Sequence, residues 1–272
     1  MPFLKTPRGK FFYLKYSSAG PVVYLLHGLT SKSQDWETIP DRLASKGFQV
    51  FAFDMRGHGQ SDKSKSGYAP EDLARDIEVC SRAFDHDKIH VVGHSTGGRN
   101  ALFFATMFVQ KTATLTILDQ TLEADPESWR DFQKNYAEYP TPFVDEASLD
   151  QFLLNRFPDP KERRRKFEKG QFAITKTGQW DWNFSIPAAL EIQRLGRAQA
   201  LHWLLKRIQC PVLFLKGGDS SYVSAEEKEK ITALLSPESF VVIENAGHGL
   251  FRDNPDAFLG VLEPFLRSNN PA

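Results

Sequence analysis

The chain has 272 residues, which is enough for one large domain or for a domain with a small insertion. Its 34 lysine and arginine residues balance 34 aspartate and glutamate residues, and this zero net charge argues against a nucleic-acid partner, which needs a basic surface. Its two cysteines, Cys80 and Cys210, are too few for a disulfide framework and lack metal-ligand spacing.

The N-terminal half alternates apolar runs with segments of helical spacing. Residues 22–26 (Val-Val-Tyr-Leu-Leu) form a continuous apolar run, which is typical of a strand buried on both faces of a parallel sheet. The patterns predict strands at 11–16, 22–26, 48–53, 89–92 and 113–118, and helices at 33–43, at 68–84 and after residue 95. This alternation indicates an α/β fold with a mostly parallel sheet flanked by helices.

The alternation stops after Asp119 for about ninety residues and then resumes. In between, the sequence predicts helices at 126–137, 146–157, 160–168, 187–195 and 198–208, and a hairpin at 172–184. Strands at 211–215 and 240–244 and helices at 226–235 and 256–266 follow. We interpret 120–208 as an inserted, mainly helical cap on a core of residues 1–119 and 209–272. Two of the cap's aromatic residues, Trp180 and Trp182, are candidates for lining a substrate pocket, although such residues more often form a cap's own core.

The stretch 93–97 reads Gly-His-Ser-Thr-Gly and lies between a predicted strand and a predicted helix. This is the G-x-S-x-G pattern of a nucleophile elbow, in which glycines let strand and helix pass closely around a strained serine. The start of the following helix directs backbone N–H groups at negative charge that forms beside the serine. Ser95 is therefore the candidate nucleophile.

A serine hydroxyl is a poor nucleophile near neutral pH, so Ser95 needs a base, and the base needs an acid that fixes its tautomer. Of the seven histidines, His248 lies in a Gly-His-Gly loop after the last predicted strand, where the backbone can present the ring at the carboxyl edge of the sheet. We expect His94 to point away from Ser95, and His27 and His58 to brace their loops. Structural roles are expected for His86, His90 and His202.

Four stretches in this order resemble the α/β-hydrolase fold, over nearly the whole chain. They are 93–98, His27-Gly28-Leu29, Asp54-Met55-Arg56-Gly57-His58-Gly59-Gln60-Ser61, and Ala246-Gly247-His248 followed by Pro255. The resemblance implies that Ser95 is the nucleophile and His248 the general base and acid. It also implies an oxyanion hole made by the backbone N–H groups of Leu29 and Thr96, with Asp54 and Arg56 shaping a neighbouring loop.

The position of the acid that would orient His248 departs from the family's common pattern. Most members carry this acid in a Gly-x-x-Asp motif after the strand that follows the cap. Here Gly217-Gly218-Asp219-Ser220 has a serine at that spacing and Asp219 one residue early. The alternative is Asp119, which ends the strand after the elbow helix. The segment 217–224 resembles a small bacterial esterase subgroup with the acid in that place and an assisting serine. We favour Asp119, with Ser220 as a helper, and keep Asp219 as the alternative.

Arg99 lies four residues after the candidate nucleophile, on the same predicted helix. It is a candidate substrate-binding residue, although pairing with a carboxylate of the protein is the more common arrangement. An arginine here resembles the menaquinone-pathway lyases of this fold, which bind a carboxylate-rich substrate. Those enzymes keep the acid after the later strand, and this argues against the lyase interpretation.

The sequence thus predicts a serine hydrolase that cleaves carboxylic esters or thioesters of a small-molecule substrate through an acyl-enzyme, without a metal or organic cofactor. The alternatives are a C–C hydrolase or lyase with the same residues, and a small-molecule receptor with slow or no turnover. No apolar run approaches the ~20 residues that span a bilayer, and the N-terminus lacks a signal-peptide core. We therefore expect a cytoplasmic protein without integral membrane association.

Overall fold

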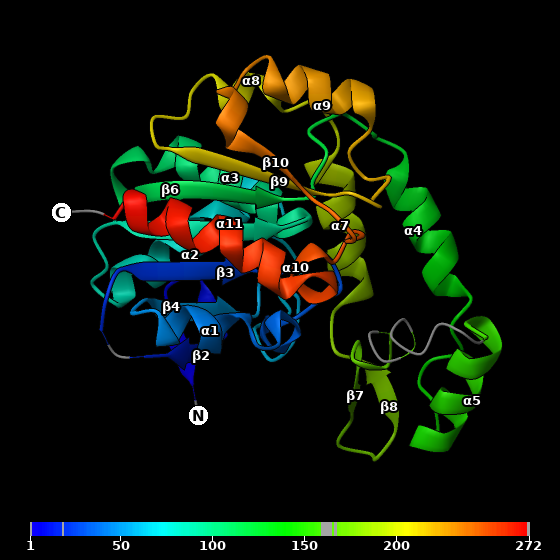
Figure 1. The fold of residues 1–272 in the computed structure, drawn as a ribbon. Helices are drawn as coiled ribbons and strands as arrows, with labels where there is room; N and C mark the ends of the chain where they lie inside the picture. The colour runs from blue at the N-terminus through cyan, green and yellow to red at the C-terminus, as the bar shows by residue number, and fades with distance from the viewer. Residues whose placement is uncertain (1, 18, 159–164, 166–167, 271–272) are drawn as a thin grey trace.

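The computed structural model describes residues 2–17, 19–158, 165 and 168–270. Its main feature is an eight-stranded sheet in the order β1-β2-β4-β3-β5-β6-β9-β10, in which β1, β2 and β4 pair antiparallel and all other neighbours pair parallel (Figure 1). The strands are β1 (Phe3–Thr6), β2 (Gly9–Tyr16), β3 (Val22–Leu26), β4 (Gln49–Phe53), β5 (Ile89–His94), β6 (Thr112–Leu118), β9 (Val212–Gly217) and β10 (Phe240–Ile243). The predicted α/β fold is confirmed. Strand β1 was not predicted, because its four residues lack a buried position.

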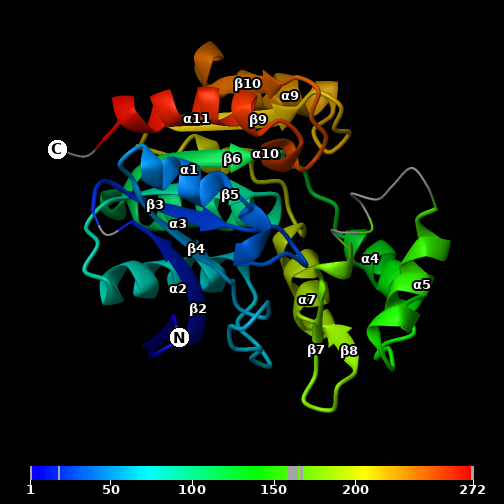
Figure 2. The same cartoon turned by 60° about the horizontal axis from the view of Figure 1, so that its bottom comes forward.

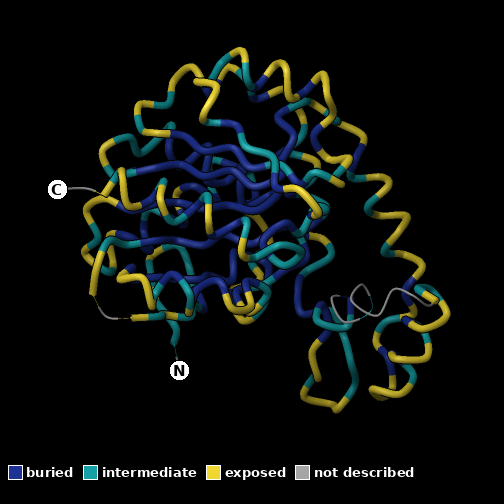
Figure 3. Tube along the Cα trace, in the orientation of Figure 1, coloured by how far each residue is buried: buried dark blue, intermediate teal, exposed yellow. Residues whose placement is uncertain are grey.

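Helices cover both faces of this sheet (Figures 1 and 2). One face packs against α1 (Ile39–Ser45), α10 (Leu250–Asp253) and α11 (Pro255–Ser268), and the other against α2 (Pro70–Ala83), α3 (Thr96–Met107), α8 (His202–Leu205) and α9 (Ala225–Thr232). The central strands β4 and β5 are buried along their whole length (Figure 3). Such burial on both faces is what their continuous apolar runs predicted.

The segment between β6 and β9 lies to one side of the sheet (Figure 1). It contains α4 (Ser128–Ala137), α5 (Glu146–Arg156), the hairpin β7 (Phe172–Ile174) and β8 (Trp180–Trp182), and α7 (Ile186–Gly196). A small apolar cluster of its own holds α5 against the hairpin. The predicted helix at 160–168 falls largely outside the described residues. Helix α8 is shorter than predicted, and Leu204 packs into the main core, so this end of the segment adjoins the α/β core.

Short helices complete the chain: η1 (Ser33–Trp36), η2 (Val109–Lys111) and η3 (Pro237–Ser239). The predicted helix at 33–43 is therefore divided into η1 and α1, with Glu37 between them in a left-handed conformation (φ 51°). No helix in the described ranges is long and apolar enough to cross a membrane.

Candidate active site

Ser95 occupies the tip of a sharp turn between β5 and α3. Its backbone is in an unusual conformation (φ 53°, ψ −122°), and its N–H donates to the Leu118 carbonyl over 2.8 Å. A Cβ at Gly93 would lie 2.2 Å from the Gly97 carbonyl oxygen, and a Cβ at Gly97 would lie 2.2 Å from that of Leu26. Only glycine fits at either position. The structure thus has the strained elbow that the sequence predicted.

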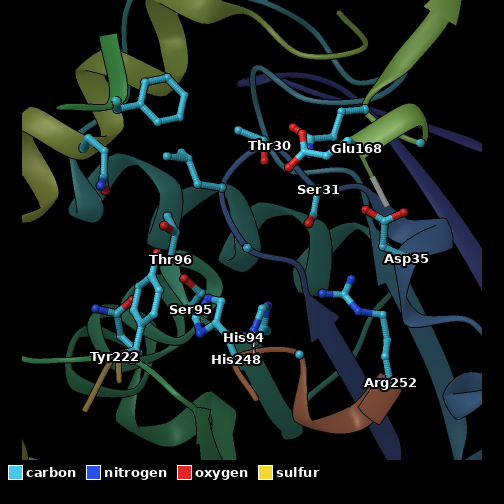
Figure 4. A pocket seen from close by; sticks show the side chains of 18 of the residues that line it. Thr30, Ser31, Asp35, His94, Ser95, Thr96, Glu168, Tyr222, His248 and Arg252 are labelled. Atoms are coloured by element: carbon cyan, nitrogen blue, oxygen red, sulfur yellow. Dashed lines mark hydrogen bonds between the residues drawn. The ribbon is translucent and has the colours of Figure 1, made fainter. Parts of the chain in front are cut away.

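His248 lies beside Asp119, and Figure 4 shows its ring next to Ser95. Its Nδ1 is 2.7 Å from the Asp119 Oδ2 atom. A carboxylate only accepts hydrogen bonds, so Nδ1 carries the proton and the lone pair of Nε2 is left for the serine hydroxyl. This is the arrangement of base and acid that a serine nucleophile needs.

Asp119 is completely buried at the end of β6, in a left-handed conformation (φ 46°) that turns its side chain towards the neighbouring loops. Besides His248, it accepts hydrogen bonds from the Gly217 N–H (3.2 Å, to Oδ1) and from the Ser220 hydroxyl (to Oδ2). Asp219 is exposed, and its N–H donates to the Ala246 carbonyl. The geometry therefore favours Asp119 over Asp219, with Ser220 in the expected helping position.

Two aromatic rings enclose the His248 side chain. The Tyr222 ring stacks on it with centroids 3.8 Å apart and an angle of 14°, and the His94 ring lies on it at 4.6 Å. Burial, reinforced by the proximity of His248 and Arg252, holds the pKa of His94 well below its usual range, so its neutral Nε2–H donates to the His248 carbonyl over 2.8 Å. From the sequence we expected His94 to point away from Ser95 and assigned no role to Tyr222, although Tyr222 lies in the segment 217–224.

Leu29 and Thr96 border the pocket together with Ser95. Thr96 is the first residue of α3, so its N–H lacks an acceptor within the helix. The loop that carries Leu29 is fixed by His27, whose Nδ1–H donates to the Gly28 carbonyl (2.7 Å) and whose Nε2 accepts from the Met55 N–H (2.9 Å). Burial lowers the pKa of His27 to about 4, so the ring stays neutral and keeps both bonds at physiological pH.

Asp54 and Arg56, which were expected to shape a neighbouring loop, do not line the pocket and form hydrogen bonds that fit this role. Asp54 accepts hydrogen bonds from the N–H groups of Ser33 (2.7 Å) and Gln60 (2.8 Å). Arg56 forms a buried, two-pronged ion pair with Asp76, with both N–O distances 2.6 Å. The bond to Ser33 ties the loop after β4 to η1, the ion pair with Asp76 ties it to α2, and the bond to Gln60 braces it internally, so these groups are already engaged away from Ser95.

The pocket above Ser95 measures about 1230 Å³ and is lined by residues of both the core loops and the segment 120–208. Its aromatic lining consists of Phe132, Tyr136, Tyr139, Phe157 and Tyr222. The predicted Trp180 and Trp182 do not line it. They pack instead against the apolar cluster of α5 and the hairpin, where the Trp182 ring stacks on Phe172 at 4.1 Å. Strand pairing in the hairpin directs both tryptophans to that cluster.

Arg99 does line the pocket, and it is only 3% exposed. The more common arrangement, an ion pair with a carboxylate of the protein, is wrong here: the side chain forms no hydrogen bond or ion pair with any described residue, and its Nη1 is buried without a partner. Within the described part of the chain, no group of three or more histidine, cysteine, aspartate or glutamate side chains is arranged to hold a metal ion.

Comparison with known proteins points to a single family. Residues 21–255 match the family described as alpha/beta hydrolase fold. The chain is 27% identical to 2-(acetamidomethylene)succinate hydrolase of Mesorhizobium japonicum, over 93% of this chain and 90% of that protein. It is 24% identical to a putative esterase/lipase of Haemophilus influenzae, over 96% and 88% of the two chains.

The fold agrees with solved structures as well. A crystal structure of E-2-(acetamidomethylene)succinate hydrolase superimposes with a TM-score of 0.85, at 26% identity, over 97% of this chain and 98% of that one. The family match spans most of the sequence and includes the candidate nucleophile, acid and base. The chain therefore belongs to the α/β-hydrolase-fold family and is a hydrolase.

Proposed function

We propose that this hydrolase cleaves carboxylic esters or thioesters of small molecules through an acyl-enzyme formed on Ser95. The observation that supports this most directly is the 2.7 Å contact between His248 Nδ1 and buried Asp119, with the strained Ser95 beside the ring. The large pocket above Ser95 suits a small-molecule substrate. In this proposal Asp119 is the acid, and Ser220 assists it.

The proposed reaction follows from these positions. His248 Nε2 takes the proton of the Ser95 hydroxyl while Oγ attacks the substrate carbonyl. The N–H groups of Leu29 and Thr96 stabilise the oxyanion, each donor contributing about 3 kcal/mol. His248 then gives the proton to the departing alkoxide or thiolate, and the acyl group remains on Ser95. A water molecule, deprotonated by His248, releases the acid and restores the serine.

Labelling by a fluorophosphonate probe, followed by turnover of a panel of aryl and alkyl esters, tests the proposal. We expect rapid phosphonylation of Ser95, identified by mass spectrometry of the modified peptide, and turnover of at least one ester. The Ser95→Ala variant should show neither. Labelling elsewhere in the chain would contradict the proposed nucleophile.

Two alternatives have different signatures. A receptor with the same residues would be labelled but would turn over no ester of the panel. A C–C hydrolase or lyase would cleave carbon–carbon bonds or eliminate, and a lyase would leave no acyl group on Ser95 during turnover. The position of Asp119 favours hydrolysis. The menaquinone-pathway lyases, which also have an arginine at the position of Arg99, carry their acid after the strand that follows the cap.

The stacked ring of Tyr222 allows a further prediction about His248. Tyr222→Ala is expected to lower kcat by about 3- to 10-fold, because an aromatic contact of this kind contributes about 0.5–1.5 kcal/mol and its loss lets the imidazole leave its productive orientation. Tyr222→Phe keeps the stacked ring and should stay within about twofold of the wild type. Steady-state kinetics on one neutral ester measures both. An effect on KM alone would show that the ring contacts substrate without positioning His248.

A further inference from the structure

A buried positive charge without a protein partner lies in the same pocket as Ser95. Arg99 is 3% exposed, and its Nη1 is buried with no hydrogen-bond partner. An isolated buried charge typically costs several kcal/mol, so proteins seldom retain one unless it is paired. Natural chains tolerate such a cost at sites where a ligand completes the pairing.

A second guanidinium adds to this unbalanced charge. Arg197 follows the last residue of α7, lines the same pocket, and has a buried Nε without a partner. Burial, together with the positive charge of Arg197, lowers the pKa of Arg99 to about 9. Arg197 itself pairs with Asp125 (Nη2 to Oδ2, 3.2 Å). The two arginines and Asp125 together leave about one positive charge, which a single anionic group would neutralise.

Two carboxylates that line the pocket, Asp35 and Glu168, accept hydrogen bonds from groups other than Arg99. In Figure 4, Asp35 and Glu168 lie on one side of Ser95 and Tyr222 lies on the other. Asp35 accepts from the Lys32 N–H (3.1 Å), and Glu168 accepts from Tyr139 (3.3 Å) and Gln171 (2.9 Å). Neither of these carboxylates forms an ion pair or hydrogen bond with Arg99.

The Arg99 guanidinium packs against the end of α7. A Cβ at Gly196 would lie 2.2 Å from Arg99 Nη1, so the glycine leaves the guanidinium its present position. Arg99 is four residues after Ser95, a rise of about 6 Å along the helix. Its N–H donates to the Ser95 carbonyl over 3.3 Å. Because helical side chains lean towards the N-terminus, the Arg99 side chain extends back towards Ser95.

From these features we infer that Arg99 and Arg197 form a carboxylate-binding subsite, so that the preferred substrate is a half-ester or half-thioester of a short dicarboxylic acid. A guanidinium presents parallel N–H donors that match the two oxygens of a carboxylate. The net charge of about one suits a carboxylate better than a doubly charged phosphate. Arg99 lies four residues after Ser95 and lines the same pocket, and this spacing suits a substrate with a few carbon atoms between its two carboxyl groups. This inference rests on the proposed ester hydrolysis and specifies its substrate class.

The first experiment compares two substrates that differ in one charge. Monoethyl succinate carries a free carboxylate, and ethyl butyrate replaces it with a methyl group. Release of acid is followed at constant pH. The wild type is expected to prefer monoethyl succinate by at least about 10-fold in kcat/KM, because a carboxylate that completes a buried ion pair is strongly discriminated from an apolar group. Equal values for the two esters would overturn the subsite.

Substitutions then assign the preference to the arginines. Arg99→Met should lower the kcat/KM ratio of the two esters by about 10-fold and so remove the preference, and Arg197→Met should lower it by about threefold, because Arg197 is already paired with Asp125. Arg99→Lys keeps the charge without the planar fork and should give an intermediate ratio. The matched control is Arg194→Met, which removes an exposed arginine of α7 paired with Glu191 and should leave the ratio unchanged. An unchanged ratio in Arg99→Met would overturn the inference.

A binding measurement and a stability measurement separate failure of the subsite from failure of ester hydrolysis. Calorimetry with the Ser95→Ala variant should detect succinate binding. Adding Arg99→Met to this variant should abolish the binding. Both results are expected whether or not the wild type turns over any ester. Inorganic phosphate binding as tightly as succinate would contradict the carboxylate class. Thermal unfolding gives the second readout: Arg99→Met should unfold at the wild-type temperature or above, because it removes an unpaired buried charge. A fall of several degrees with succinate binding retained would identify a purely structural arginine.

Discussion

Ser95→Ala is expected to lower kcat for ester hydrolysis by about 10⁵- to 10⁶-fold, the largest effect of any substitution proposed for this chain. In the proposed reaction the Ser95 hydroxyl, next to the His248 ring, forms the acyl-enzyme. Without it, water must attack the bound ester, supported by the oxyanion donors alone, which retain about 10³–10⁴-fold over the uncatalysed rate. Single-turnover kinetics on an activated aryl ester measures the residual rate.

The folded state provides the control for this substitution. Ser95 is 8% exposed, and its backbone conformation is strained (φ 53°), so alanine should leave the turn in place at a similar strain. Thermal unfolding should therefore differ little from that of the wild type. Loss of less than about 100-fold in kcat, in a folded variant, would mean that another residue carries the acyl group.

Asp119→Asn is expected to lower kcat by about 10⁴-fold, because an amide disrupts the tautomer of His248. Two donors, the Ser220 hydroxyl and His248 Nδ1–H, converge on Asp119 Oδ2, and the Gly217 N–H donates to Oδ1. The NH₂ group of an asparagine would face either the two donors at the Oδ2 position or the Gly217 N–H at the Oδ1 position. If it faces His248, the imidazole must present Nδ1 as an acceptor. The proton then lies on Nε2, which can no longer take the serine proton.

Asp219→Asn is the matched control, since it makes the same chemical change at the other candidate acid. Its side chain is exposed and lies outside the His248 contact, so kcat should stay within about threefold of the wild type. The two kcat values, measured on one neutral ester, decide between the aspartates. A greater loss from Asp219→Asn than from Asp119→Asn would reverse the assignment.

Much of the candidate site follows from local pattern, because parallel strands end at a common edge. The stretch 93–97 predicted the turn that strains Ser95, and the loop around His248 follows the last strand of the same sheet. These positions depend on short-range signals: apolar runs that mark strands and glycines that permit tight turns. The choice between Asp119 and Asp219 needed the tertiary structure as well. Each aspartate follows a strand, and only the contact of Asp119 with His248 distinguishes the two.

Other contacts had no signal in the sequence. Tyr222 stacks on His248 although its segment carries no aromatic motif, and His94 bonds to the His248 carbonyl from a position expected to point away. Trp180 and Trp182 were candidates for the pocket because of their size, yet the hairpin directs them to a separate cluster. An aromatic residue buries well in either place, so its identity does not determine which one it occupies.

By itself the sequence determined the α/β fold, the strained elbow at Ser95 and the loop that presents His248, because each depends on residues adjacent in the chain. Only the tertiary structure decided that Asp119 contacts His248 and that Arg99 lies unpaired beside Arg197. Both depend on distances between segments far apart in the sequence. Those distances are set by the packing of β6, β9 and α7, which no local pattern encodes.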